Sequence, residues 1–243
     1  MRRRSSSATS RGFTRGCAAD LVAQRLTVVV PALNEAPGIV ACLERLAPLR
    51  ARGHEVMVVD GGSTDATVRL AAPLADRVIA APRGRAVQMN AGAAAAAGDA
   101  LLFLHADTLL PPDADRAVLA ALAERSWGRF DIAIDSDDPR LAVIAFFINR
   151  RSRLTGIATG DQAIFVRRDA FPGFAPIALM EDVAFSRAMK RVSPPACLAA
   201  RVVTSARRWE RRGVARTVLL MWRLRLAYWR GADPDELARR YPD

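Results

Sequence analysis

Three carboxylates each stand at the end of a short apolar segment, where a side chain can meet a ligand. Glu35 follows the segment LTVVVPALN, Asp60 ends EVMVVD, and Asp107 ends ALLFLHAD. A carboxylate in such a place can accept hydrogen bonds from a base or a ribose. An aspartate can also bind Mg²⁺ or Mn²⁺, which prefer oxygen ligands and share their remaining positions with a diphosphate. Asp107 at a strand end thus suits a divalent cation, Mg²⁺ or Mn²⁺, bound together with a diphosphate, but each of these segments can also be an ordinary connection after a strand.

Charged residues in two other segments fit the same chemistry. RGRAVQMNAG places Arg83 and Arg85 at a loop and the start of a helix, where cationic side chains can hold phosphates. MEDVAFSR begins a second helix with Glu181 and Asp182, and a carboxylate there can take the proton of an attacking hydroxyl. Each feature also has a simpler interpretation: the arginines can be solvated, and the acidic pair can favour the helix dipole.

Alternating strands and helices are expected to position these residues. Runs that are apolar on both faces are typical of buried parallel strands. Their alternation with helical segments predicts an α/β domain with a mostly parallel sheet flanked by helices, whose ligands bind at the carboxyl ends of the strands. The expected strands are Leu26–Val30, Glu55–Asp60, Asp76–Ala80 and Ala100–Asp107, and the expected helices are Gly38–Arg50, Asp65–Ala72 and Arg85–Ala97.

The second half of the chain has a less regular pattern. Strands are expected at Trp127–Ile134, Gln162–Val166 and Ala199–Val203, and helices at Leu141–Arg153, Glu181–Arg191 and Val214–Arg230. We predict three parts: a disordered basic tail (1–24), a catalytic α/β domain (25–205) and a basic amphipathic helical extension (206–243). In the last helix, Arg216, Arg223 and Arg230 fall on one stripe at 100° per residue, and Arg225 lies on the opposite side.

The net charge of +11 is concentrated in two segments. Residues 1–24 hold five Arg and one Asp, and residues 201–230 hold nine Arg and one Glu, so these segments carry +4 and +8 and leave −1 for the rest. A nucleic-acid-binding protein usually carries basic residues across a folded face, so no nucleic-acid partner is expected. A basic segment with apolar neighbours instead favours peripheral contact with an anionic membrane.

Other features concern location. A basic start without a following apolar run is not a secretion signal, and no run of eighteen uncharged apolar residues predicts a membrane span. The expected location is the cytoplasm, with peripheral contact at the cytoplasmic face of the membrane. Cys17, Cys42 and Cys197 are far apart and form no metal-ligand motif, so free thiols are expected.

Motifs that are weak one by one form a specific series. PALNE, VVDGGSTDAT and GRAVQMNAGAAAAAGDALLFLHADT, in this order, strongly resemble the family 2 glycosyltransferases of the GT-A (Rossmann-like) fold. The resemblance covers about residues 26–200. It looks closest to a bacterial branch named for arsenosugar biosynthesis, which is similar to carotenoid-acid (diaponeurosporenoate-type) glycosyltransferases that act at membranes. GDQAIFVRR, MEDVAFSRAMKR and SARRWERRG also look like that branch.

The resemblance implies a role for each matching position. Glu35 and Asp60 would contact the nucleoside of the donor, Asp107 would be the metal-binding member of an Asp-x-Asp motif, and Asp182 would be the general base. His105 takes the place of the first aspartate of that motif, where a neutral imidazole could bind the ribose or the metal. The predicted donor-binding residues are Pro31, Asn34, Glu35, Asp60, Arg85, Asn90, His105 and Asp107. The residues predicted to face the acceptor or the transferred sugar are Gly160, Asp161, Gln162 and Glu181.

The predicted function is transfer of a sugar from a nucleotide-diphosphate donor, a UDP-sugar, to a hydroxyl or carboxylate of a small-molecule or lipid acceptor. One base and direct displacement predict inversion at the anomeric carbon, with help from the metal. One alternative is a sugar-phosphate nucleotidyltransferase, which would normally carry a Gly-rich phosphate loop where PALNE stands. Another is a non-catalytic carbohydrate- or membrane-binding relative, although the chain retains Asp60, Asp107 and Asp182.

Overall fold

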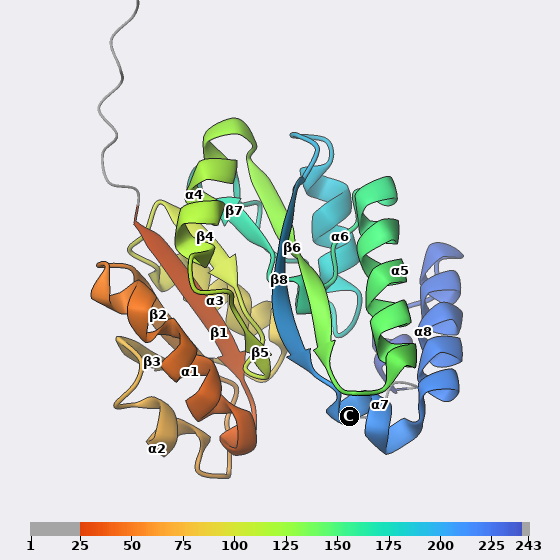
Figure 1. Cartoon of the computed structure of the whole chain (residues 1–243), viewed down its shortest axis with the longest axis horizontal. Helices are drawn as coiled ribbons and strands as arrows, with labels where there is room; N and C mark the ends of the chain where they lie inside the picture. The colour runs from red at the N-terminus through yellow and green to blue at the C-terminus, as the bar shows by residue number, and fades with distance from the viewer. Residues whose placement is uncertain (1–24, 240–243) are drawn as a thin grey trace, which may run out of the picture.

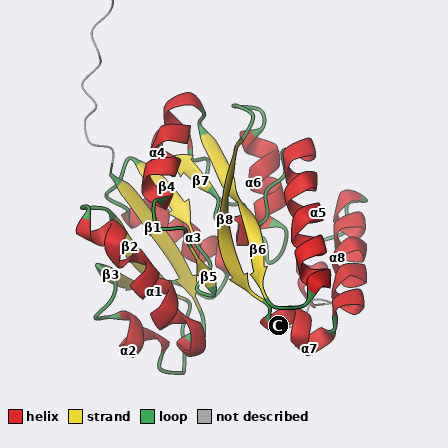
Figure 2. Cartoon of the chain, in the orientation of Figure 1, coloured by secondary structure: helices red, strands yellow, loops and turns green. Residues whose placement is uncertain are grey.

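The computed structural model describes residues 25–239. The predicted tail at 1–24 and the last four residues of the predicted extension, 240–243, lie outside the described residues. Eight strands form one sheet in the order β3-β2-β1-β4-β7-β6-β8-β5. Helices cover both faces of this sheet, as Figures 1 and 2 show. The predicted α/β class, with a mostly parallel sheet flanked by helices, is confirmed.

The first half of the chain alternates strand and helix as predicted. Strand β1 pairs with β2 and β4, and β2 with β3, all in parallel, so their carboxyl ends meet at one edge. The elements are β1 (Leu26–Ala32), α1 (Ala36–Ala51), β2 (Glu55–Asp60), α2 (Thr67–Ala71), β3 (Arg77–Ala80), α3 (Arg85–Ala95) and β4 (Ala100–Phe103).

Strand β4 is shorter than predicted. It ends at Phe103, and the chain then turns, with the backbone N–H of Thr108 donating to the carbonyl of His105 at 3.0 Å. His105 and Asp107 therefore lie in a turn after the strand. Because the alternation of side chains holds only within a strand, it does not set the directions of these two side chains.

The second half of the chain adds antiparallel pairing. Strand β7 pairs antiparallel with β4 and β6, β8 runs parallel to β6, and β5 pairs antiparallel with β8. The elements are β5 (Thr108–Leu109), α4 (Ala114–Glu124), β6 (Trp127–Asp135), α5 (Pro139–Thr155), β7 (Phe165–Arg167), α6 (Glu181–Met189) and β8 (Ala196–Ser205). The strand predicted at Gln162–Val166 starts later than expected, because Gly160–Gln162 forms a turn of 3-10 helix.

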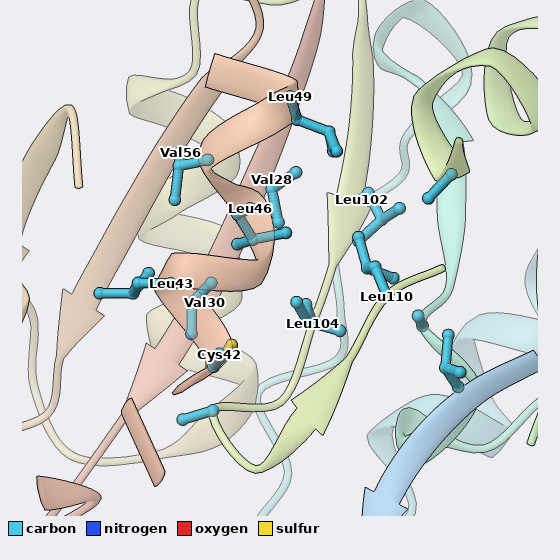
Figure 3. Packing of buried hydrophobic residues seen from close by; sticks show 14 of the residues in the cluster. Val28, Val30, Cys42, Leu43, Leu46, Leu49, Val56, Leu102, Leu104 and Leu110 are labelled. Carbon is cyan, nitrogen blue, oxygen red and sulfur yellow. The ribbon is translucent and has the colours of Figure 1, made fainter. Parts of the chain in front are cut away.

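Two apolar layers hold the helices onto the sheet. Along β1, Val28 and Val30 point into the layer beneath α1, while Val29 points into the layer beneath α3, as alternation in a strand requires. Leu43, Leu46 and Leu49 of α1 complete the first layer (Figure 3). Burying one such leucine contributes about 1.5–3 kcal/mol. The wholly apolar sequence of β1 thus reflects burial on both faces.

Three helices follow the sheet: α7 (Arg207–Arg212), α8 (Val214–Trp229) and α9 (Pro234–Arg239). Helix α8 packs through Leu224 against Met180 and Val183 at the start of α6 and Leu237 of α9. Trp222 and Trp229 remain more than 70% exposed on its other sides. Within residues 25–239, none of the helices combines the length and apolar character needed to span a bilayer.

Candidate active site

The loops after β1 and β2 are fastened to each other at the carboxyl edge of the sheet. Asn34, in a left-handed conformation with φ of 54°, accepts a hydrogen bond from the backbone N–H of Thr64 at 2.9 Å. Its own N–H donates to Ser63 Oγ at 2.9 Å, and the N–H of Glu35 donates to Thr67 Oγ1 at 2.8 Å. The predicted donor residue Asn34 therefore joins the two loops by hydrogen bonds, while Glu35 contributes its backbone N–H to this contact and not its carboxylate.

Asp60 closes the loop that follows it. Its carboxylate is nearly buried and accepts hydrogen bonds from the backbone N–H groups of Gly62 and Ser63, at 3.0 and 3.1 Å. These bonds fix its position at the tip of β2, beside half-buried Pro31 at the end of β1. The structure thus places both predicted donor residues at the same edge as Glu35.

Gln88, which the sequence alone did not indicate as a site residue, joins two strand ends at this edge. The amide of Gln88, on α3, donates at 2.8 Å to the carbonyls of both Ala32 and Val59, and so joins the ends of β1 and β2. A Cβ added at Gly61 would lie 2.9 Å from Gln88 Cδ, so a side chain there would displace the Gln88 amide. The signal in the sequence was a glutamine on the apolar side of an Ala-rich helix.

Helix α3 also reaches toward the acidic pair. Arg85 Nη1 lies 3.2 Å from Glu181 Oε1, which joins the predicted donor and acceptor sides. Burial raises the pKa of Glu181, with the charge of Asp182 adding to this and Arg85 opposing it. The side-chain amide of Asn90 donates to the carbonyl of Phe174 and accepts from its N–H, each at 2.8 Å. Asn90 therefore fixes the 171–174 segment and does not point to open space.

An arginine from α7 lies between two of the predicted site carboxylates. Arg207 Nη2 is 3.0 Å from Glu35 Oε2 and 3.6 Å from Asp107 Oδ2. Its hydrogen bond to Glu35 raises the pKa of Arg207 above the usual range. Beneath them the pKa of buried Cys42 is raised to about 12, by burial first and then by the charges of Asp107 and Glu35. Arg207 belongs to the SARRWERRG segment, but its contact with Glu35 is visible only in the folded chain.

Asp107 could bind a divalent cation that takes its other ligands from a diphosphate and water. Its side chain is 30% exposed and that of Glu35 is 29% exposed, so both can meet a ligand from solution. In the described part of the chain, no three His, Cys, Asp or Glu side chains gather as a complete metal site. An exposed carboxylate with few protein partners fits Mg²⁺ or Mn²⁺, which can take its other oxygens from a diphosphate and water.

His105 packs against the turn at Gly160. Its Nε2 is buried and has no hydrogen-bond partner among residues 25–239, and a Cβ added at Gly160 would lie 2.7 Å from it. Burial lowers the pKa of His105 well below its usual value, and the positive charges of Arg85 and Arg208 lower it further. The low pKa favours the neutral imidazole at this position.

Asp182 is held in one orientation by two backbone groups. Its Oδ2 accepts from the N–H of Gly160 at 2.9 Å and its Oδ1 from the N–H of Val183 at 2.7 Å. Next to it, Asp161 Oδ1 is buried and has no hydrogen-bond partner in the described part of the chain. Gln162 is fully buried and bonds to the backbone of Thr159 at 3.1 Å, so it supports the turn. The structure thus brings Gly160, Asp161 and Asp182 together.

The part of the chain that forms this edge matches the model of one enzyme family. The family model for glycosyl transferase family 2 matches residues 27–174, a region that includes Glu35, Asp60 and Asp107. The chain belongs to glycosyl transferase family 2.

Named relatives are glycosyltransferases from mycobacteria. The PGL/p-HBAD biosynthesis glycosyltransferases of Mycobacterium bovis and Mycobacterium tuberculosis are 34% identical to this chain over 170 residues. The match covers 65% of this chain and 65% of each relative, so a third of each relative has no counterpart in the aligned region.

Solved structures share the fold at low sequence identity. TarS 1–349 of S. aureus gives a TM-score of 0.60 at 18% identity, covering 75% of this chain and 60% of that chain. Glucosyl-3-phosphoglycerate synthase of Mycobacterium tuberculosis, in complex with Mn²⁺, UDP and glucosyl-3-phosphoglycerate, gives 0.57 at 20% identity, covering 75% and 71%. The predicted GT-A fold is confirmed.

Proposed function

We propose that this protein transfers a sugar from a UDP-sugar to an acceptor and inverts the anomeric centre. One observation carries the proposal. Glu35, Asp60 and Asp107 lie at the carboxyl edge of the parallel strands, and Arg85 connects that edge to the acidic pair at Asp182 through Glu181. Solved structures of the same fold, in complex with UDP and Mn²⁺ or Mg²⁺, support the choice of donor and metal.

Asp182 is the proposed general base. Two backbone N–H groups fix its carboxylate and leave further lone pairs to accept a proton from the acceptor hydroxyl. Glu181 is less suited to this role, because it is buried and paired with Arg85. Asp161 and His105 would line the same side and contact the acceptor or the transferred sugar.

Asp107 is the proposed protein ligand of a divalent cation, with Glu35 beside it. When bound, such a cation supplies positive charge for the departing diphosphate. Glu35 and Asp60 would bind the nucleoside, and Arg85 and Arg207 would add positive charge near the diphosphate. Residues 206–243 would thus act together with the domain at 25–205, since Arg207 reaches the site from α7.

The finer identity of the acceptor is also a proposal. The motifs resemble the arsenosugar and carotenoid-acid branch, which supports a small-molecule or lipid acceptor met at a membrane. The exposed Trp222 and Trp229 of α8, with Arg223 and Arg230 beside them, support peripheral contact with an anionic leaflet. We place this contact at the cytoplasmic face.

Product analysis tests the function directly. The protein is incubated with a panel of UDP-sugars, Mn²⁺ and aqueous or lipid extracts as acceptors, and the products are measured by mass spectrometry. We expect release of UDP with a glycosylated product. Release of pyrophosphate would instead identify a nucleotidyltransferase, and UDP-sugar binding without turnover in any extract would favour a binding protein.

A further inference from the structure

A second cluster of charged side chains lies beyond the donor edge, near the turn at Gly160–Gln162. Arg151 comes from α5 and Arg225 from α8, two helices that lie side by side in Figure 1. Their guanidinium groups are close enough to repel each other, and Arg151 also interacts with the negative charges of Asp161 and Asp182. The cluster therefore adjoins the proposed base.

Protein groups do not satisfy the polar atoms of this cluster. Within residues 25–239, Arg151 Nη2, Arg225 Nε and Asp161 Oδ1 are buried without a hydrogen-bond partner. A buried group left unpaired costs on the order of 1–3 kcal/mol. Native proteins contain few such groups, so the two unpaired arginine donors, Arg151 Nη2 and Arg225 Nε, indicate a place where a ligand completes the hydrogen bonds.

The arginine pair favours an anion as that ligand. Burial, followed by repulsion from Arg225, lowers the pKa of Arg151 to about 10, so Arg151 is still charged at neutral pH. Asp161 and Asp182 attract Arg151 and Arg129 repels it, but neither carboxylate forms a hydrogen bond to Arg151 Nη2 or Arg225 Nε. Arginine donors match the oxygens of a carboxylate or phosphate group.

We propose that Arg151 and Arg225 form an anion-binding subsite that holds a carboxylate or phosphate group of the acceptor while the acceptor hydroxyl lies at Asp182. This inference rests on the proposed glycosyl transfer. Exposed aromatic side chains stand on the same helix faces, with Phe147 one turn before Arg151 and Trp222 and Trp229 one turn to either side of Arg225. The acceptor is thus a hydroxylated molecule with an anionic group and an apolar body.

Titration with inorganic phosphate tests the subsite. UDP and Mn²⁺ are added first at saturating concentration, so that phosphate cannot report the donor diphosphate site. Calorimetry should show saturable phosphate binding that becomes at least about tenfold weaker in Arg151→Gln and in Arg225→Gln, because charge-assisted hydrogen bonds are lost. Arg45→Gln, an exposed arginine on α1, is the matched control and should bind phosphate like the wild type.

Thermal unfolding separates ligand binding from a structural role. Without phosphate, Arg151→Gln should unfold at the same temperature as the wild type or higher, since it removes a buried guanidinium whose Nη2 has no hydrogen-bond partner. A clear loss of stability, or a phosphate affinity that neither variant changes, would overturn the subsite. UDP binding is measured in a separate experiment. If the protein does not bind UDP, the proposed function is wrong. The phosphate titration can then be done without UDP, and it still tests the two arginines.

The same variants test whether the anionic group belongs to a free acceptor or to a lipid headgroup. Vesicles of phosphatidylglycerol are tested for binding with and without phosphate. If Arg151→Gln and Arg225→Gln lose phosphate binding but keep vesicle binding, the group belongs to a free acceptor. If they lose both, and phosphate competes with the vesicles, the group is a lipid headgroup. Either result supports an anion subsite at this position.

Discussion

Arg207 donates a hydrogen bond of 3.0 Å to Glu35, across 172 residues of chain. The contact brings α7 onto the edge where β1 ends, and it places a fixed cation 3.6 Å from Asp107. A positive side chain in that place and a divalent metal ion compete for the same carboxylates.

Removing this cation should therefore strengthen metal binding in the absence of donor. We expect Arg207→Gln to bind Mn²⁺ roughly two- to fivefold more tightly, a modest effect because Arg207 is 45% exposed and solvent screens it. Mn²⁺ titration followed by electron paramagnetic resonance measures this. Arg211→Gln, on the exposed side of α7, should leave the affinity unchanged. Equal affinities for the wild type and Arg207→Gln would show that the arginine and the metal occupy different places.

Asp107→Asn should abolish metal-dependent UDP binding. The amide keeps the size of the carboxylate but loses the charge that binds Mg²⁺ or Mn²⁺. We expect UDP affinity to become insensitive to EDTA and turnover to fall by orders of magnitude. Asp137→Asn, an exposed aspartate far along the chain, is the control. Near-normal activity that EDTA still inhibits would mean that another group holds the metal.

Asp182→Asn should separate catalysis from donor binding. An amide is almost without basicity, so turnover should fall by about 10²–10⁴-fold while UDP affinity changes by only a few fold. Both oxygens of Asp182 accept backbone N–H bonds, so the amide loses one of them at a cost of about 1 kcal/mol. The unfolding temperature of the variant must therefore be measured beside its activity. A drop in UDP affinity as large as the drop in turnover would move Asp182 to the donor site.

Gly160→Ala should collide with His105. The new Cβ would lie 2.7 Å from His105 Nε2, which is fixed by burial. We expect a loss of about 1–3 kcal/mol in the free energy of unfolding. Adding His105→Ala should recover much of this loss in a double-mutant cycle followed by denaturant unfolding. If the two losses simply add, the two residues are not in contact.

Helix α8 should bind anionic vesicles in a salt-sensitive way. Arg residues beside exposed Trp222 and Trp229 suit the headgroup layer, and their attraction weakens as salt screens it. In flotation with phosphatidylglycerol vesicles, changing Arg216, Arg223 and Arg230 together to Gln should prevent binding, whereas Arg45→Gln should not. Protein that stays in the aqueous fraction at low salt would argue for an acceptor met in solution.

Local sequence predicted the parallel half of the fold well. LTVVV, EVMVVD and ALLF are apolar on both faces because each strand is covered by helices on both sides, and such runs are visible without any tertiary knowledge. Helix α4 was missed although Ala114, Val118 and Leu122 recur at intervals of four, the spacing of one buried helix face. This spacing is visible in the sequence alone.

The parts of the site that local sequence did not predict depend on contacts between residues far apart in the chain. Arg207, Gln88 and Arg225 matter through partners far away in the chain, and nothing in their own segments indicates those partners. The end of β4 was also misjudged, because the apolar run continues through Leu104 while pairing stops at Phe103. The roles of the predicted site residues stay predictions; the structure gives their positions and neighbours.

The bond between Gln88 and the ends of β1 and β2 has a consequence for how this sequence can diverge. Because the amide of Gln88 occupies the space that a side chain at position 61 would need, the two positions should vary together. A homologue with alanine at position 61 should carry a smaller residue at position 88, and its strand ends would then need a different support. If positions 61 and 88 change together among homologues, the hydrogen bonds of Gln88 to the two strand ends have been conserved as a unit.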